Sequence, residues 1–541
     1  MADVFALGLD FGTASVRAVV ARVSDGAEFG SASAPYPSGE NGVIVSRKDP
    51  QLARQHPGDY LPALESAARR ALDQAEGRSA FARARVAGIG VDTTGSTPLP
   101  LDRDLQPLAA LPRFQAQEAA LAWLWKDHTS AGHARRLNQA ASGLPYLSRC
   151  GGAYQAEWFW AKVWNALEHA PDVAGAAYTW LELADWIPAS LCGRRRAEDL
   201  PIGVCAAGHK GLYSRDWGGW PARDFLESLH PGLARLRDRL PAQALVAGTP
   251  AGTLSPDWQR RLQLPPAAVS VGALDAHLGA VGAGVGPGTL VKILGTSTCD
   301  ILVSGDAPVP RDLPGVSGVV EGSVLPGRTG IEAGQSAVGD LFDWFARVVL
   351  RAGDHDALSA AAAALRPGQS GLLALDWNNG NRCVLADPEL SGLLVGQTLH
   401  SSAAEIYRAL IEATAFGARR ILDQVTRYGI PVERVVACGG IARKNAFLMQ
   451  LYADVLGRPM EAAGSGEACA LGAAICGAAA AGLGSVEDLQ RRMVPPPGRR
   501  YEPDAAAHAR YDPLYRLYLR LHDDEDLRGL MKELLSIRRT S

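Results

Sequence analysis

Two distant parts of the chain share one order of apolar and polar positions. Phe5–Asp10 is an apolar run that leads into the turn Gly12–Ser15, and Val16–Val23 is a second apolar run. Thr289–Val303 repeats this order around Gly295. Short apolar runs separated by a Gly-containing turn are typical of two antiparallel strands. The pattern therefore predicts one β-hairpin near the N-terminus and a second in the latter half of the chain.

A second pair of segments predicts a single strand that ends in a glycine turn. Val86–Val91 is apolar and precedes Asp92–Gly95, and Val432–Ala437 is apolar and precedes Cys438–Gly440. Each of these segments follows one of the two hairpins along the chain. A repeated order of this kind indicates internal repetition. We therefore expect two lobes with similar cores, each turning its glycine loops toward a shared cleft.

Apolar residues at helical spacing occur between these strands. Tyr60–Gln74 and Ala403–Tyr428 both have this spacing, and Gly429 follows the second as a stop signal. Ala468–Val486 has no charged residue, but its Ala and Gly content favours a tightly packed internal helix over a membrane span. Tyr501–His522 is aromatic and amphipathic, which predicts a helix packed back on the body.

The mixture of strands and helices predicts the α/β fold class. The stretch Pro241–Pro266 is rich in Gly and Pro, as turns and linkers are. We place the boundary between the lobes in this stretch. This gives an N-terminal lobe of residues 1–265 and a C-terminal lobe of residues 266–541.

Composition excludes several classes of protein. The chain has 541 residues, of which 47% are hydrophobic and 21% charged, as in globular proteins. Its formal net charge of -3 gives no basic field for nucleic acid. The eight Cys residues form no CxxC pair and no zinc-like spacing with His. The N-terminus lacks the basic region of a secretion signal, so free thiols in a reducing cytoplasm are the expectation.

The first hairpin turn carries groups that can hold phosphate. Leu7–Arg17 matches neither GxxxxGK[ST] nor GxGxxG, so the two common nucleotide loops are excluded there. Gly12 nevertheless lets the backbone approach closely, and the hydroxyls of Thr13 and Ser15 can donate. Asp10 can hold hydrated Mg²⁺. An ordinary hairpin with Asp and Gly in its turn explains the same residues.

Two later glycine segments have different interpretations. Gly282–Gly288 looks like a dinucleotide loop, but Pro287 and the strand that follows favour a connecting turn. Cys438–Asn445 lies between a predicted strand and a predicted helix. Its two glycines let a flat ring or a ribose lie against the backbone, and the helix N-terminus favours negative charge nearby. A plain strand-to-helix turn is the alternative.

Asp275 is the candidate for proton transfer. It ends the apolar run Val269–Leu274, and Ala276–Ala280 then begins a predicted helix. A general base must be placed to face the substrate, and an acid at an otherwise apolar site fits the role. Asp is also a favourable N-cap residue, so capping explains this position equally well.

The chain resembles the FGGY carbohydrate kinases, of the actin/Hsp70-like ATPase superfamily, over nearly its whole length. The motifs that carry the resemblance are Gly8–Thr13, Gly90–Thr97, Trp125–His128, Glu157–Lys162, Ala207–Lys210, Gly295–Asp300, Glu332–Ser336 and Gly439–Asn445. The first and last are shared across the family, so they specify the kinase and not the sugar. Those at Gly90–Thr97 and Trp125–His128 look specific to the members that act on ribulose.

The resemblance implies two actin-like (ribonuclease H-like) lobes, each a mixed sheet flanked by helices, with ATP and sugar between them. It makes Asp275 the catalytic base and Asp10 the metal-binding residue. The residues implied at the sugar are Gly95, Ser96, Lys210, Asp275 and Glu332. The residues implied at ATP and its phosphates are Asp10, Gly12, Thr13, Ser15, Arg17, Gly295, Thr296, Gly439, Gly440 and Asn445.

The implied reaction is transfer of the γ-phosphate of ATP to the 5-hydroxyl of ribulose, L-ribulose favoured, with Mg²⁺, in L-arabinose catabolism. The same chemistry on xylulose or ribitol is the first alternative. A nucleotide-binding regulator or chaperone of the same superfamily is the second, and it would not need a base at Asp275. A dehydrogenase is excluded by the missing dinucleotide fingerprint. No nucleic-acid or membrane partner is expected, and the oligomeric state stays open, with a homodimer as the candidate.

Other polar and aromatic residues have two interpretations each. Lys126–His128 contacts substrate or braces its own loop, and for His128 we favour the bracing role. Five tryptophans are expected in the core rather than as a platform for sugar, namely Trp123, Trp125, Trp158, Trp160 and Trp164. The Arg-rich Gly193–Gly208 gives no expectation.

Overall fold

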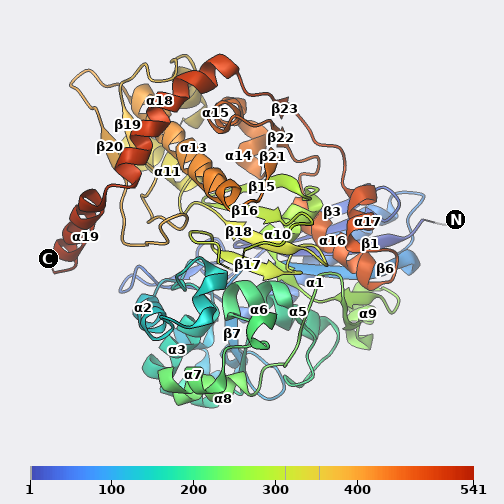
Figure 1. The fold of residues 1–541 in the computed structure, drawn as a ribbon. Coiled ribbons are helices and arrows are strands. Elements are labelled where there is room, and N and C mark those ends of the chain that lie inside the picture. The colour runs from blue at the N-terminus through green and yellow to red at the C-terminus, as the bar shows by residue number, and fades with distance from the viewer. Residues whose placement is uncertain (1–2, 311, 352–353, 541) are drawn as a thin grey trace. The chain divides into compact units, whose positions relative to one another are not determined.

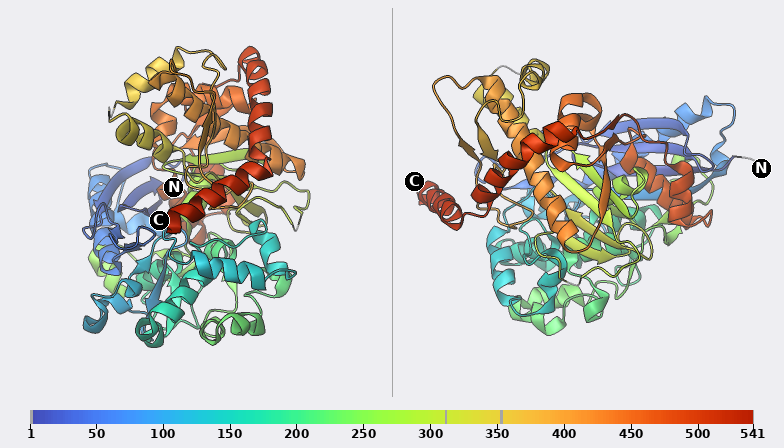
Figure 2. Two further views of the ribbon diagram at one scale, coloured as in Figure 1. Left: turned by 90° about the vertical axis from the view of Figure 1, so that its left-hand side faces the viewer. Right: turned by 45° about the horizontal axis from the view of Figure 1, so that its top comes forward.

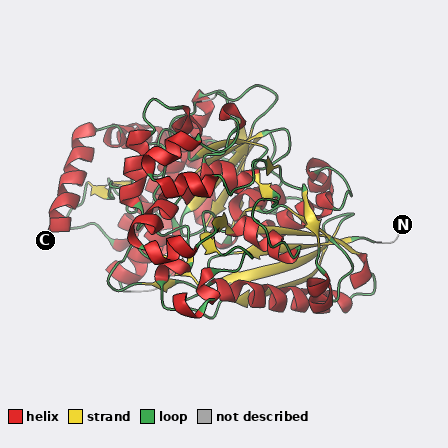
Figure 3. Cartoon of the chain, turned by 90° about the horizontal axis from the view of Figure 1, so that it is seen from below, coloured by secondary structure: helices red, strands yellow, loops and turns green. Residues whose placement is uncertain are grey.

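The computed structural model describes residues 3–310, 312–351 and 354–540. The chain folds into two compact units. The first unit consists of Met1–Gly284, Val319–Gly330 and Glu467–Pro495, and the second of Val285–Gly318, Ile331–Gly466 and Pro496–Ser541. Both units contain helices and strands, and Figure 3 shows the two kinds of element in different colours. The expected division of roles between residues 1–265 and 266–541 stays a prediction.

The sheet of the first unit has the strand order β12-β13-β6-β1-β2-β3, and β14 also pairs with β6. The strands are β12 (Pro250–Thr253), β13 (Ala268–Ser270), β6 (Val86–Thr93), β1 (Phe5–Phe11), β2 (Ser15–Arg22), β3 (Glu28–Pro35) and β14 (Ala273–Leu274). β1 runs antiparallel to β2, which confirms the first predicted hairpin. β1 runs parallel to β6, so the carboxyl ends of these two strands share one edge.

Two helices that lie far apart in the sequence cover this sheet. α1 (Tyr60–Glu76) packs on β2 and β3, and α16 (Ala468–Ala480) packs on β1 and β6 (Figure 1). A Cβ atom at Gly8 would lie 1.7 Å from the carbonyl oxygen of Ala470, and one at Gly90 would lie 1.7 Å from that of Ala473. Only glycine allows this approach of helix and sheet. The uncharged segment is therefore a buried internal helix, as predicted.

A layer of short helices follows β6 in the first unit, and Figure 1 shows it in cyan and green. The helices of the first unit beyond α1 and α16 are α2 (Ala131–Ala140), α3 (Phe159–His169), α4 (Pro171–Ala176), α5 (Leu183–Leu191), α6 (Val204–Gly211), α7 (Arg223–Leu229), α8 (Pro231–Arg237), α9 (Pro256–Leu262), α10 (Asp275–Gly282) and α17 (Val486–Met493). Its minor strands are β4 (Ile44–Val45), β5 (Ala53–Gln55), β7 (Pro98–Leu101), β8 (Ala122–Trp123), β9 (Thr179–Glu182), β10 (Ile202–Gly203) and β11 (Ala244–Leu245).

The sheet that carries the second hairpin has the order β17-β18-β16-β15-β21-β22-β23. Its strands are β17 (Gly318–Glu321), β18 (Thr329–Ala333), β16 (Thr298–Val303), β15 (Gly288–Leu294), β21 (Val432–Cys438), β22 (Met460–Ala462) and β23 (Arg500–Tyr501). β15 pairs antiparallel with β16 and parallel with β21, as β1 does with β2 and β6. The repetition predicted from the sequence is therefore confirmed in the strand pairing.

The second unit carries the two long helices that the sequence predicts. Its helices are α11 (Gly339–Asp343), α12 (His355–Ala363), α13 (Ala403–Arg427), α14 (Gly440–Lys444), α15 (Ala446–Leu456), α18 (Ala505–His522) and α19 (Glu525–Thr540), and a small sheet joins β19 (Leu373–Leu375) to β20 (Leu393–Val395). A capping box of Ser402 and Glu405 begins α13. Tyr511, Tyr515 and Tyr518 are buried where α18 crosses α13 and α15 (Figure 2), so the tail helix packs on the body as predicted. Among the helices described, none combines the length and the apolar character that crossing a bilayer requires.

Candidate active site

Three carboxyl groups meet at one edge of the first sheet. Asp10 is the register partner of Asp92 where β1 pairs with β6. Asp275 follows β14 directly, and in that strand Ala273 is paired with Asp92. Carboxyl ends of neighbouring parallel strands are where ligands bind in open α/β sheets. The fold thus brings the predicted base and the predicted metal-binding residue to the same place.

Burial raises the pKa of two of these acids, Asp10 and Asp92. Burial raises the pKa of Asp10, although Arg17 opposes the shift from 3.5 Å away. Burial also raises the pKa of Asp92 well above its ordinary value, and repulsion from Asp10 and Asp275 adds to the shift. Negative charge is therefore costly at this edge, and a cation would relieve the cost. Asp92 was not predicted as a site residue, because only the pairing of β6 with β1 brings it beside Asp10.

The β1–β2 turn is the predicted glycine hairpin. The Gly12 amide donates to the Ser15 carbonyl at 3.0 Å and closes the turn. Trp125 Nε1 donates to the Thr13 hydroxyl at 3.1 Å, and Gln55 Nε2 donates to the Thr13 carbonyl at 2.8 Å. Side chains outside the turn thus donate hydrogen bonds to Thr13, and the proton of the Thr13 hydroxyl can still donate to a ligand.

Asp275 is the first residue of α10 and not its N-cap. The N-cap is Leu274, which has no side-chain capping bond. Asp275 Oδ1 accepts from the Ala276 amide at 2.7 Å. Capping in the usual sense therefore does not account for Asp275, although an acid in the first turn still favours the helix.

The segment that begins at Gly95 lies against Leu274, the residue before Asp275. A Cβ atom at Gly95 would lie 2.3 Å from Leu274 Cδ2, next to Asp275 in the chain. Ser96 is fully buried and its hydroxyl donates to Glu182. Gly95 thus lies beside the residue that precedes Asp275, and the roles of Gly95 and Ser96 at the sugar stay predictions.

Lys210 belongs to the first unit as well. It lies near the end of α6 and is only 4% exposed. Its ammonium lies 5.1 Å from the centre of the Trp158 ring, and its carbonyl accepts from the Tyr154 hydroxyl at 2.6 Å. A cation held against an aromatic ring is stabilised by the ring face.

The second unit repeats the glycine hairpin. The Gly295 amide donates to the Ser297 carbonyl at 3.0 Å, as the Gly12 amide does in the first turn. A Cβ atom at Gly439, where φ is +99°, would lie 2.3 Å from the Leu294 carbonyl oxygen. Gly439 is thus adjacent to the turn of Gly295 and Thr296, and a side chain would not fit there.

Other predicted residues of the second unit have the following places. Gly440 opens α14, and Asn445 is the N-cap of α15, where its Oδ1 accepts from the Leu448 amide at 2.9 Å. Asn445 Nδ2 donates to the Ser359 hydroxyl at 3.3 Å. Glu332 lies on β18 and is 5% exposed. The strand-to-helix turn predicted at Cys438–Asn445 is confirmed.

Asp127 braces its loop. It forms a buried ion pair with Arg54, and its Oδ2 accepts from the Ala53 amide at 2.8 Å. The Thr129 hydroxyl donates to Asp127 Oδ1 at 2.6 Å. His128 has a side chain 40% exposed and lies 3.8 Å from Glu157, which is a loose contact. Of the five tryptophans, Trp123, Trp158, Trp160 and Trp164 are buried in the core, and Trp125 contacts the hairpin turn.

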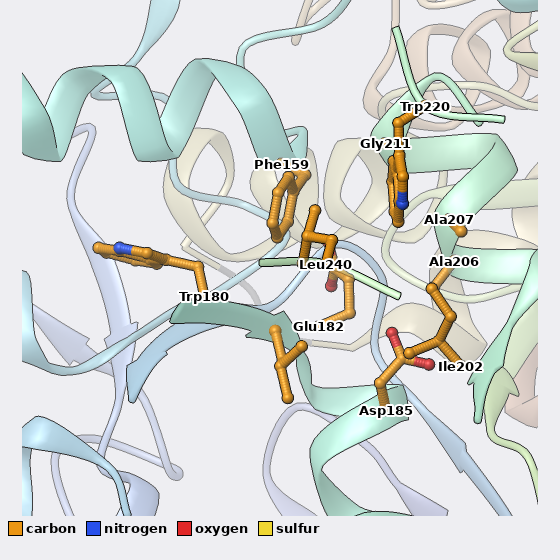
Figure 4. A pocket seen from close by; sticks show the side chains of 11 residues that line it. Phe159, Trp180, Glu182, Asp185, Ile202, Ala206, Ala207, Gly211, Trp220 and Leu240 are labelled. Carbon is orange, nitrogen blue, oxygen red and sulfur yellow. The ribbon is translucent and has the colours of Figure 1, made fainter. Parts of the chain in front are cut away.

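An aromatic-walled cavity lies among the short helices of the first unit. Figure 4 shows Phe159, Trp180 and Trp220 on its walls, with Glu182 and Asp185 as its acids. Burial raises the pKa of Asp185 to about 8, although the Gly203 amide donates to its carboxylate at 2.9 Å. Asp185 is therefore protonated in the folded protein at a pH where it would be ionised in the unfolded chain.

We expect Asp185→Asn to gain stability relative to the wild type as the pH rises. The folded-state pKa is raised, so the stability that Asp185 contributes is complete below the unfolded pKa and is lost as the pH rises through 8. The difference in unfolding free energy should change by up to about 1.4 kcal/mol per pH unit across this range. Urea unfolding at pH 5, 7 and 9 measures it. A difference independent of pH, as expected for exposed Asp224→Asn, would contradict this assignment.

The fold defined by these two sheets is that of solved sugar kinases. The structure of a "xyloylose kinase" from Brucella ovis superposes with a TM-score of 0.80 at 21% identity, covering 96% of this chain and 99% of that one. The xylulose kinase from Rhodospirillum rubrum gives a TM-score of 0.78 at 25% identity, with the same coverage. The predicted actin-like α/β fold class is confirmed.

The chain belongs to the FGGY family of carbohydrate kinases. It matches the N-terminal domain of that family over residues 5–200 and the C-terminal domain over residues 290–481. A ribulokinase from Vibrio parahaemolyticus serotype O3:K6 is 41% identical over 523 residues, 92% of each chain. A ribulokinase from Mycolicibacterium smegmatis is 40% identical over 544 residues, 96% of this chain and 93% of that one. The protein is therefore an enzyme that phosphorylates a carbohydrate.

Proposed function

We propose that this enzyme transfers the γ-phosphate of ATP to the 5-hydroxyl of ribulose, with L-ribulose favoured, and so forms ribulose 5-phosphate in L-arabinose catabolism. The observation that carries the proposal is similarity to ribulokinases along nearly the whole chain, at 41% identity to the one from Vibrio parahaemolyticus. The carboxyl cluster of the first unit supports it, because a kinase needs a base beside its phosphate site.

Asp275 is the proposed base. Its place after β14 puts a carboxylate at the sheet edge, where the 5-hydroxyl can lose its proton as it attacks phosphorus. General base catalysis contributes about 10²–10⁴-fold.

The phosphates are held by turns of both hairpins in this proposal. The residues from the first are Asp10, Gly12, Thr13, Ser15 and Arg17, and those from the second are Gly295 and Thr296. Gly439, Gly440 and Asn445 contact the adenosine. Residues 1–265 contain the first phosphate turn and contribute Gly95, Ser96 and Lys210 to the sugar site, and residues 266–541 supply Asp275 and the adenosine site.

Mg²⁺ fits the residues present in the first unit. Asp10 and Asp92 are buried acids with raised pKa values, which is the donor set that a hard divalent cation stabilises. Asp10 would hold the ion, and the ion would neutralise charge on the transferred phosphate. Arg17, 3.5 Å from Asp10, would bind the phosphate oxygens directly.

The sugar contacts are Gly95, Ser96, Lys210, Asp275 and Glu332. Lys210 donates to hydroxyls and Glu332 accepts from them. A site built to bond several hydroxyls rejects analogues that lack one of them, because its buried polar groups are then left unpaired. Xylulose and ribitol have the same number of carbons as ribulose, so they are the competing substrates.

A substrate panel tests the proposal. ADP release is measured with ATP, Mg²⁺ and each of L-ribulose, D-ribulose, xylulose, ribitol and glycerol. We expect the highest kcat/KM with L-ribulose. Turnover of xylulose, ribitol or glycerol well above either ribulose would replace the assignment with another FGGY specificity, and no turnover on any of them would favour a nucleotide-binding regulator.

A further inference from the structure

A buried lysine holds the backbone beside the candidate sugar site. Lys162 lies on α3 and is fully buried. Its ammonium donates to three carbonyls: that of Ser96 at 2.9 Å, that of Trp123 at 3.1 Å and that of Leu124 at 2.9 Å. An ammonium has three donors, so all of its capacity is used on backbone.

A buried glutamate accepts hydrogen bonds from two other polar groups of the same segment. Glu182 ends β9 and is 5% exposed. It accepts from the Ser96 hydroxyl, and its Oε2 accepts from the Thr97 amide at 2.7 Å. The carbonyl, the hydroxyl and the following amide of this short segment are thus all bonded to Lys162 or Glu182.

The surroundings make this pair costly. Burial lowers the pKa of Lys162 to about 7, and the charge of Glu182 only partly offsets that shift. Burial likewise raises the pKa of Glu182, beside the aromatic cavity wall of Phe159 and Trp180 (Figure 4). Apolar residues of similar volume often stabilise a fold as well as buried ionisable groups do. We therefore attribute the benefit of Lys162 and Glu182 to the backbone conformation that their hydrogen bonds stabilise.

The conformation it fixes is that of Gly95–Thr97. Gly95 packs against the side chain of Leu274, the residue before Asp275. A Cβ atom placed at Gly95 would lie 2.3 Å from Leu274 Cδ2. Displacement of Ser96 would therefore change both the sugar contacts and the wall against which the base is placed.

We propose that Lys162 and Glu182 are positioning residues for the acceptor sugar: they clamp Gly95–Thr97 in the conformation that binds it, without touching ATP. This inference rests on the proposed function for the identity of the sugar and for the contact of Gly95 and Ser96 with it. Neither residue was predicted from the sequence as part of the site. Loss of the Lys162–Glu182 clamp should therefore raise the KM for the sugar and leave the KM for ATP nearly unchanged.

Lys162→Met tests the clamp because it keeps the volume and removes every donor. We expect the KM for ribulose to rise roughly 10- to 100-fold, the effect of losing charge-assisted hydrogen bonds. The KM for ATP should stay within about threefold of the wild type, since hydrogen bonds to ATP are not removed. Asn165→Leu is the matched control, because Asn165 lies on the same helix and donates to the Thr129 carbonyl at 2.8 Å. It should leave both KM values unchanged.

Two variants at Glu182 keep the test valid if Lys162→Met does not fold. Glu182→Gln keeps an oxygen for the Thr97 amide and should lie near the wild type, whereas Glu182→Ala should raise the KM for sugar as Lys162→Met does. Equal rises for sugar and ATP, or lowered thermal stability with both KM values unchanged, would overturn the clamp. If the panel finds another acceptor, the proposed function fails, and the clamp is judged on the KM of that acceptor.

Discussion

Asp275→Asn should lower kcat by about 100-fold or more while ATP still binds. Asn has the size of Asp, and its side-chain oxygen can still accept from the Ala276 amide, which donates to Asp275 Oδ1 at 2.7 Å. The first turn of α10 should therefore be preserved. Asn cannot take a proton from the sugar hydroxyl. Steady-state kinetics with ribulose and MgATP give kcat, and calorimetric titration gives the affinity for ATP.

A matched control separates catalysis from helix stability. Asp172 is likewise an acid in the first turn of a short helix, α4, and its side chain is exposed. Asp172→Asn should leave kcat unchanged, because Asp172 has no part in the carboxyl cluster. Near-normal turnover in Asp275→Asn would remove Asp275 from the mechanism and leave its place after β14 to structure alone.

Asp10→Asn should raise the Mg²⁺ concentration needed for half-maximal activity by roughly tenfold or more, the usual cost of losing a bond to a charged group. Asp10 is 4% exposed, so water does not replace the lost charge. The change also removes one source of the repulsion that raises the pKa of Asp92, and it leaves Arg17 without its partner at 3.5 Å. Titration of activity with Mg²⁺ at fixed ATP measures the effect.

Asp25→Asn is the control for Asp10→Asn. Asp25 also pairs with an arginine of β2, since its Oδ1 accepts from Arg22 Nε at 2.9 Å, but it lies at an exposed turn. Its replacement should leave the Mg²⁺ dependence as in the wild type. An unchanged Mg²⁺ requirement in Asp10→Asn would count against a metal role for this residue.

The sequence predicts local elements well because their signals are local. Apolar runs around a glycine turn predict both hairpins, and apolar residues at helical spacing predict α1 and α13. Ala468–Val486 is predicted as an internal helix because small residues allow close packing, and Gly8 and Gly90 provide the matching surface on the sheet. The repetition of the two halves is also confirmed, because β1 and β15 each pair with one antiparallel strand and one parallel strand.

Long-range arrangement was beyond local signals. The sequence locates the helix at Ala468–Ala480 but not its packing on β1 and β6, which lie hundreds of residues earlier. Asp92 reads as the first residue of a turn, and only its pairing with Asp10 reveals a charge cluster. Lys162 appears in the sequence only as the end of the motif Glu157–Lys162, because nothing local shows that its ammonium donates to three backbone carbonyls. For Asp275 the sequence leaves a base and an N-cap as alternatives, and its position as the first residue of α10 excludes the N-cap.

The identity of the phosphorylated product tests the central claim most directly. The purified enzyme is incubated with ATP, Mg²⁺ and L-ribulose, and the product is followed by phosphorus and carbon NMR. The account predicts one ADP per ribulose consumed and a phosphorus coupled to C5 of the sugar. Phosphate on another carbon, or ADP formed without any sugar phosphate, would contradict it.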